Sequence, residues 1–334
     1  MELYLFRERE YAEFYNCSLL SDKEWDDLRQ PNPVLGFGLL AFGALILVPY
    51  VLSLIFIRNT DLYAYSSYKI MFYLGITDVL CIIANSAATG YFAIIGAVAC
   101  TSMDLQYLVA CLCLGLWANQ CATCVVLAIN RCVQIADFQM LKSLFKGRRT
   151  YAWIVLCALY GVYVMFEIKA LTFSSVYSTW FFDPYVGIDA FESVDRSYYT
   201  STLHTVNNAG AVVVLLILNV LLVIQLRVDR NQAGSSRRCS KIQNSATIQS
   251  FFICLVTIYT SLAFLANQFV TMPSFITVAS SFSWQLSNAA PGLMYILINR
   301  TIRVGVAKML RRTNKVGTQG QIYSISLQRE TAKW

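Results

Sequence analysis

Residues 34–57 read VLGFGLLAFGALILVPYVLSLIFI, without one charged side chain. A helix needs about 20 mostly apolar residues to cross a bilayer, because the hydrocarbon core is about 30 Å thick and each residue rises about 1.5 Å. Backbone N–H and C=O groups must also be paired inside lipid, which favours helices. Further stretches share this character, so the sequence predicts an all-α bundle of seven transmembrane helices. The predicted spans are residues 34–57, 69–97, 103–130, 150–172, 205–226, 247–270 and 275–299.

Composition and charge agree with a membrane protein and set its orientation. Hydrophobic residues make up 57% of the 334 residues and charged residues only 13%, whereas a soluble domain carries about 25% charged residues. Most of the 26 Lys and Arg residues fall in loops on one side of the predicted bundle and in the C-terminal segment. The positive-inside rule makes that side cytoplasmic. We therefore expect an extracellular N-terminus, a cytoplasmic C-terminus and a membrane-facing role for the net charge of +7, not a nucleic-acid partner.

The segments outside the predicted bundle each have a distinct character. Residues 1–33 form an acidic extracellular tail without a signal-peptide pattern, so the first span is expected to act as an uncleaved insertion signal. Residues 300–334 are expected to be cytoplasmic. They begin with a basic segment in which Ile302, Val306 and Met309 recur at near-helical spacing. This pattern predicts a short amphipathic helix along the inner leaflet, with membrane lipid as its partner.

Two sequons provide a test of this topology. Asn16, in Asn16-Cys17-Ser18, lies on the expected extracellular tail and is a candidate glycosylation acceptor. Asn299, in the second sequon, lies on the expected cytoplasmic side and should stay unmodified.

The 11 cysteines do not form a disulfide framework once they are placed on the topology. Most lie inside predicted spans or in cytoplasmic loops, where thiols stay reduced. The pair Cys121 and Cys124 lies inside a span, which favours small packing residues over a metal or redox site. Only Cys17 and Cys100 face the oxidising side, so the sequence predicts a Cys17–Cys100 disulfide. No cofactor is expected.

Asp78 lies midway along the second span, and an ionisable side chain there costs a few kcal/mol, which marks a candidate functional site. Its expected partners are Ser or Asn side chains of the third and seventh spans, together with a water or Na⁺. The alternative is a structural hydrogen bond that only joins helices.

Two further positions stand out at the ends of spans. Arg131, at the inner end of the third span, could hold neighbouring helices closed or dock a partner; the alternative is an ordinary positive-inside anchor. In the seventh span Pro291 and Gly292 are adjacent, which weakens the helical hydrogen bonds and predicts a hinge.

At these residues the chain resembles a seven-helix G-protein-coupled receptor, and most closely a nematode serpentine chemoreceptor of class T (Srt). The resemblance covers nearly the whole chain. It rests on Leu3–Phe6, Tyr15–Ser18, Tyr68–Met71, Leu74–Gly75, Asp78, Gly96–Val98, Cys100, Leu127–Cys132, Trp180–Tyr185, His204, Asn207–Asn208 and Asn299–Arg303.

The resemblance implies a plasma-membrane receptor, with a sensory cilium as one place for it, that detects a small chemical and activates a heterotrimeric G protein. Arg131 would match the arginine of the Asp-Arg-Tyr motif, Asp78 the aspartate of the second helix and Pro291 the proline of the seventh. Asn288 and Tyr295 complete the implied activation switch. Asn130 and Cys132 replace the acid and the tyrosine of the Asp-Arg-Tyr motif, so this chain departs from the rhodopsin-like pattern.

The ligand is expected in a cavity between the third, fifth, sixth and seventh spans. Each polar candidate for its lining could instead face a neighbouring helix. His204, the only histidine, could contact ligand or sense pH, or be an interfacial hydrogen-bonding residue. The candidate lining residues are Gln106, Tyr107, Asn207, Asn267, Gln268 and Trp284.

Rival classes fit less well. A ligand-gated channel subunit of the seven-helix odorant-receptor type would place the N-terminus inside, against the charge distribution. A transporter usually shows internal repeats and several mid-membrane charges. An enzyme is not expected, because a single histidine and a single mid-membrane acid form neither a metal cluster nor a dyad.

Overall fold

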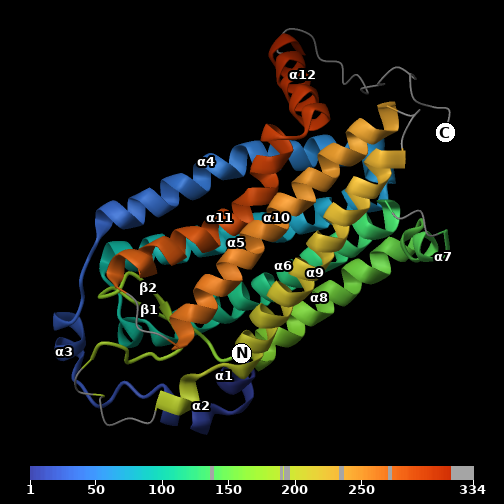
Figure 1. Cartoon of the computed structure of the whole chain (residues 1–334). Coiled ribbons are helices and arrows are strands. Elements are labelled where there is room, and N and C mark those ends of the chain that lie inside the picture. The colour runs from blue at the N-terminus through green and yellow to red at the C-terminus, as the bar shows by residue number, and fades with distance from the viewer. Residues whose placement is uncertain (136–138, 189–190, 192–195, 233–236, 270–272, 317–334) are drawn as a thin grey trace.

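The computed structural model describes residues 1–135, 139–188, 191, 196–232, 237–269 and 273–316. In this part of the chain long helices pack side by side into one bundle (Figure 1), which confirms the predicted all-α class. Six of them are long and apolar enough to cross a membrane. The bundle consists of α4 (Pro33–Arg58), α5 (Ser66–Ile95), α6 (Met103–Ile135), α8 (Arg149–Glu167), α9 (Thr202–Gln232), α10 (Arg237–Phe269) and α11 (Ser274–Leu297).

The helix of the bundle that falls outside those six is α11, and its composition explains why. It carries buried polar side chains, among them Ser283, Gln285 and Asn288, which lower its mean hydropathy. Such side chains are tolerated in a spanning helix when they face other helices. α11 therefore presents its polar face to the inside of the bundle.

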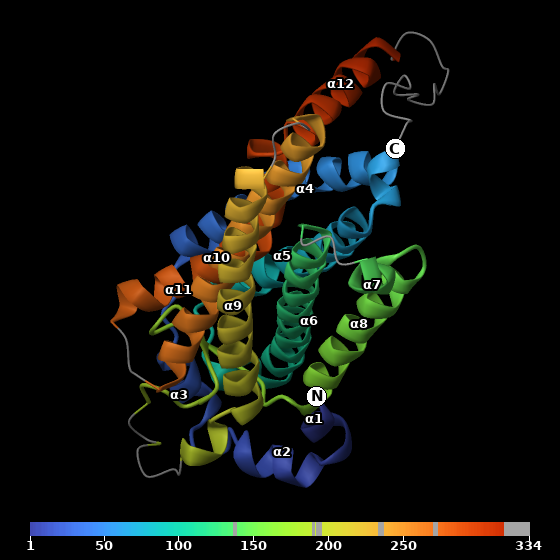
Figure 2. The same cartoon turned by 45° about the vertical axis from the view of Figure 1, so that its right-hand side comes forward.

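Short elements close the two ends of the bundle. α1 (Glu2–Phe6), α2 (Glu8–Phe14) and α3 (Asp22–Asp27) lie at one end, and α12 (Arg300–Val316) lies at the other (Figures 1 and 2). We call these the tail end and the α12 end. The remaining short elements are η1 (Asp61–Ala64), η2 (Ala99–Thr101), α7 (Gln139–Lys142), η3 (Ser143–Phe145), β1 (Thr172–Ser174), β2 (Thr179–Phe181) and η5 (Arg196–Tyr199).

Several spans differ from their predicted bounds, among them the fourth, fifth and sixth. α8 ends at Glu167, because the chain becomes extended at Ile168 and Thr172 already belongs to a strand. That strand, β1, pairs antiparallel with β2, and Phe173 stands opposite Trp180. α9 and α10 reach beyond the apolar stretches, since a helix continues past the lipid without needing apolar side chains.

Local signals start and stop the helices. The Asn32 side chain accepts a hydrogen bond from the Leu35 N–H (3.0 Å), and Pro33 occupies the first turn of α4. Gly96 ends α5 in the left-handed region (φ 67°), where glycine is favoured. Asn299 starts α12 by accepting a hydrogen bond from the Ile302 N–H (3.2 Å).

α6 is the central helix, with α5, α8, α9 and α10 packed around it. One apolar cluster fills the tail end and contains Trp25, Tyr107 and Trp180. A second fills the α12 end, where Ile302 and Val306 of α12 are buried. α12 thus packs one apolar face on the bundle, as expected for an amphipathic helix.

Candidate functional site

The tail is fastened over the end of the bundle. Cys17 and Cys100 are joined by a disulfide with a Cα–Cα distance of 5.5 Å, and these are the two cysteines paired from sequence. Tyr185 donates its hydroxyl to the Asn16 carbonyl (2.9 Å), and Tyr199 donates to the Phe14 carbonyl (2.6 Å). The tail and the loop before α9 therefore form one cover over the bundle.

Tyr107 of α6 lies directly beneath this cover. Its ring centroid is 5.0 Å from that of Tyr11 and 5.1 Å from that of Tyr15, both edge to face. Such pairs add about 0.5–1.5 kcal/mol to area burial. Tyr107 is thus an anchor for the tail.

Gln106 joins the same cover to α6. Its Nε2 donates to the Val98 carbonyl (2.9 Å), and its Oε1 accepts from the Phe173 N–H (2.7 Å). Both the nitrogen and the oxygen of the side-chain amide are hydrogen-bonded to backbone groups, so Gln106 positions strand β1 against the start of α6.

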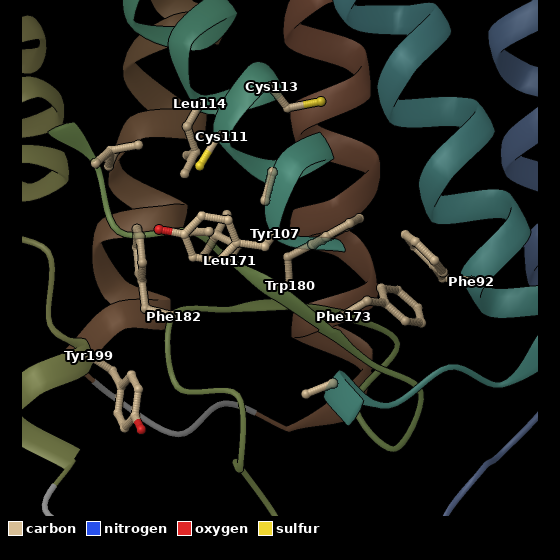
Figure 3. Close-up of a cluster of buried hydrophobic side chains, with 14 of the residues drawn as sticks. Phe92, Tyr107, Cys111, Cys113, Leu114, Leu171, Phe173, Trp180, Phe182 and Tyr199 are labelled. Carbon is tan, nitrogen blue, oxygen red and sulfur yellow. The ribbon is translucent and has the colours of Figure 1, made fainter. Parts of the chain in front are cut away.

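Below the cover two small adjoining cavities lie between the helices: the first has a volume of about 10 Å³, and the second is too narrow to hold a water molecule. Figure 3 shows loop residues Leu171 and Trp180 beside Cys113 and Leu114 of α6. The first cavity is lined by Leu114, Trp117, Leu171, His204, Phe264 and Trp284. The second is lined by Asn85, Val109, Ala110, Cys113, Leu171, Trp180 and Trp284.

A chain of hydrogen bonds runs along the wall of the first cavity. Trp117 donates its indole N–H to Asn208 Oδ1 (2.9 Å), and Asn207 Nδ2 donates to the same oxygen (3.1 Å). Asn208 Nδ2 lies 2.9 Å from His204 Nε2, and His204 Nδ1 lies 3.0 Å from Gln268 Oε1. The chain links α6, α9 and α10.

This chain determines the tautomer of His204. Because Asn208 Oδ1 already accepts from Trp117, its amide nitrogen faces His204 and donates. His204 Nε2 must then be the acceptor, so Nδ1 carries the proton and donates to Gln268. Both ring nitrogens are satisfied by neutral groups, and the ring is neutral.

A polar layer lies nearer the middle of the bundle. Tyr50 of α4 donates its hydroxyl to Asp78 Oδ2 (2.6 Å). The expected Ser or Asn partner from the third or seventh span is therefore wrong for this oxygen, because the first helix brings a phenol to it. Asp78 Oδ1 is buried and has no partner among the described residues.

Because of Pro291, one backbone carbonyl of α11 has no hydrogen-bond donor within its own helix and can accept from another helix. Proline lacks the N–H that would reach the carbonyl four residues earlier, which is Ser287. The Ser287 carbonyl instead accepts a hydrogen bond from Gln120 Nε2 of α6 (3.2 Å). Next to it Asn288 Nδ2 donates to the Trp284 carbonyl (2.9 Å), so the same turn adjoins the cavity.

At the α12 end, Arg131 is buried without a carboxylate among the described residues. Its Nη2 lies 3.6 Å from Met71 Sδ, and its Nε has no partner. Tyr295 donates its hydroxyl to the Met71 carbonyl (3.1 Å) and packs against Tyr50, with ring centroids 5.8 Å apart. Met71 therefore lies between Arg131 and Tyr295.

Comparison with known proteins shows which family the chain belongs to. The sequence matches the family described as serpentine type 7TM GPCR chemoreceptor Srt over residues 1–319. The chain belongs to the Srt family. It is also 26% identical over 304 residues to serpentine receptor class T-55 of Caenorhabditis elegans, covering 90% of this chain and 81% of that relative.

Membership of the Srt family confirms the resemblance seen in the sequence. The family is one of chemoreceptors of the G-protein-coupled seven-helix type, and not of enzymes. With its apolar helices, this Srt chain is a multi-pass membrane protein.

Only some of the predicted lining residues of the Srt chain lie at the cavities. Trp284 lines both cavities, and Gln268 lies behind His204 in the cavity wall. Asn207 accepts a hydrogen bond from Tyr160 of α8 (2.9 Å), so it faces away from the cavity.

Neither Gln106 nor Tyr107 lines either cavity. Gln106 and Tyr107 hold the loop and the tail, because the cover folds back over the start of α6. The side chain of Asn267 lies outside the described residues.

Sequence reasoning missed Trp117 and Asn208, and it gave His204 mainly an interfacial role. A signal was present, because His204 and Asn208 are four residues apart and share one helix face. The partner Trp117 is 91 residues from Asn208, and no local pattern connects the two.

Proposed function

We propose that this Srt receptor detects a small extracellular chemical and activates a heterotrimeric G protein. In this proposal the N-terminus is extracellular and the receptor acts in the plasma membrane, with a sensory cilium as one location. The supporting observation is the site of the cavities. They lie under the tail, and α6 and α11 run from them to the opposite end of the bundle.

The ligand would bind among the residues of these cavities. A ligand shifts a conformational equilibrium only by binding one state better than the other. Here it would contact Trp284 and Trp117, which belong to α11 and α6, the helices that lead to the α12 end. Ligand binding would thus favour one relative placement of α6 and α11.

The polar layer would carry this change along α11. Asn288 contacts the backbone of Trp284, and Gly292 packs against the ring of Tyr50, which in turn donates to Asp78. The hydrogen bond from Gln120 to the Ser287 carbonyl would break and form again as α11 moves at the turn of Pro291. Asp78 Oδ1, which is buried and has no partner in the described part of the chain, fits a role in holding Na⁺ in the resting state.

The α12 end would accept the G protein. Lys146, Arg148 and Arg149 are exposed there, and their charge suits an acidic partner or anionic lipid headgroups. Arg131 is buried next to Met71 and Tyr295, so its release from this packing would expose a cation to the G protein. The basic residues Arg237 and Arg238 would lie nearby; their side chains are outside the described residues.

The test is G-protein activation in cells that express the wild type or Arg131→Ala, screened against pooled volatile and water-soluble chemicals. We expect a ligand-dependent response that the substitution removes while surface expression is unchanged. Arg58→Ala removes an exposed arginine at the same end and should keep the response. An unaltered response in Arg131→Ala would contradict the role of Arg131. A ligand-evoked current without G proteins would contradict the proposal as a whole.

A further inference from the structure

The two cavities share two walls and one chemical character. Leu171 and Trp284 border both, so they form the partition between them. Apart from His204, every lining side chain is apolar, aromatic, thiol or amide, and none carries a charge. Transfer of a charged ligand into such a site would leave its charge without a counter-ion.

His204 does not change this conclusion. Both ring nitrogens are engaged by the side-chain amides of Asn208 and Gln268. A proton added to Nε2 would face the donating N–H of Asn208. The ring is therefore a neutral part of the wall and offers no free donor or acceptor to a ligand.

Three tryptophans line the cavities, and only one has a free indole N–H. Trp117 donates to Asn208 Oδ1 and Trp180 donates to Thr89 Oγ1, each at 2.9 Å. Trp284 Nε1 has no acceptor among the described residues, although the side chain is only 5% exposed. A buried donor without an acceptor is destabilising, so the site favours a molecule that provides one.

We propose that the ligand of this site is a neutral, mainly apolar or aromatic molecule with a carbonyl or ether oxygen that accepts a hydrogen bond from Trp284 Nε1. This inference rests on the proposed receptor function and names its ligand class. The first cavity, of about 10 Å³, is too small for such a molecule, and the second has no room even for a water molecule. Binding must therefore move the partition of Leu171 and Trp284 and merge the two cavities. That movement starts at the turn of α11 that also contains Asn288.

Three probes of matched shape test the ligand class. Acetophenone has a carbonyl, α-methylstyrene replaces its oxygen by a methylene group, and benzoate adds a charge. Affinities are measured by ligand-observed NMR on the full chain in nanodiscs, with empty nanodiscs to subtract partition into lipid. We expect acetophenone to bind about tenfold more tightly than α-methylstyrene, and benzoate not to bind at about 1 mM.

Two matched variants test the donor. Trp284→Phe keeps an aromatic ring and removes the free N–H, so the preference for acetophenone over α-methylstyrene should fall to about one. Trp153→Phe removes an indole N–H that lies outside both cavities and is already bonded to the Leu144 carbonyl, so the tenfold preference should remain. The thermal unfolding midpoint verifies that each variant is folded; if Trp284→Phe does not fold, the probe ratio of the wild type decides.

Each other result overturns the inference. These are equal binding of acetophenone and α-methylstyrene, no binding of acetophenone at about 1 mM, tight binding of benzoate, or an unchanged preference in Trp284→Phe. The receptor function is tested separately. A charged agonist that activates the G protein would retain that function and reject this ligand class. Selective acetophenone binding by a chain that activates no G protein would retain the ligand class and reject the receptor function.

Discussion

Asn208 is the side chain on which the cavity wall depends most. Its oxygen accepts from Trp117 and Asn207, and its nitrogen serves His204. Because all these groups are at least partly buried, the removal of one amide leaves several donors and acceptors unpaired.

We predict that Asn208→Leu lowers the free energy of unfolding by about 1–3 kcal/mol, because buried groups lose their partners. The thermal unfolding midpoint in detergent measures this. Asn207→Leu serves as the control: it loses the bond from half-buried Tyr160 and one bond to Asn208, so the loss should be smaller. An equal or larger loss in Asn207→Leu would show that the wall does not depend on Asn208.

At the scale of elements, one close contact between helices involves two glycines. A Cβ on Gly161 of α8 would lie 2.7 Å from Asn119 Cβ and 2.9 Å from the Gly115 carbonyl oxygen of α6. Small residues allow helices in a membrane to approach in this way. Gly210 of α9, in contrast, is exposed, and a Cβ there would meet nothing within 4 Å.

The same substitution should therefore act in opposite directions at the two positions. We predict that Gly161→Ala lowers stability by about 1–3 kcal/mol, since it forces α6 and α8 apart. Gly210→Ala should raise stability by up to about 1 kcal/mol, since alanine is the better helix former. Unfolding midpoints of the two variants verify both signs, and a stabilised Gly161→Ala would refute the tight α6–α8 contact.

At the scale of the whole molecule, the two sequons report the orientation. Asn16 lies on the tail, whereas Asn299 is buried, donates to the Tyr68 hydroxyl (3.3 Å) and caps α12. We predict that an endoglycosidase shifts the mass of the wild type and of Asn299→Gln, but not of Asn16→Gln. A glycan on Asn299 would require the opposite orientation in the membrane.

The Cys17–Cys100 disulfide spans a sequence separation of 83 residues and ties the tail to the start of α6. We predict that Cys17→Ser lowers stability by about 2–4 kcal/mol, because the cross-link restricts the unfolded chain. Cys132→Ser is the matched control, since a hydroxyl can replace the thiol that donates to the Leu218 carbonyl. A thiol count under denaturing conditions should show one new free thiol in Cys17→Ser. No change in the unfolding midpoint of Cys17→Ser would contradict the role of the disulfide in stability.

Much of the fold was predictable because the required signals are local. The length of the apolar stretches indicated the spans. The bounds were less predictable where lipid no longer decides them: residue 172 was assigned to the fourth span but belongs to β1, which pairs with a strand further along the loop.

The sequence by itself determined that this protein is a seven-helix membrane bundle of Srt type, because hydropathy and motif order are properties of the linear chain. It also singled out Trp284 and the buried Asp78. Only the tertiary structure decided that Tyr50 reaches Asp78, that Gln120 takes the carbonyl left by Pro291, and that the tail covers Tyr107. The physical reason is that each of these partners comes from a different helix or from the tail, and helix packing alone determines which side chains meet.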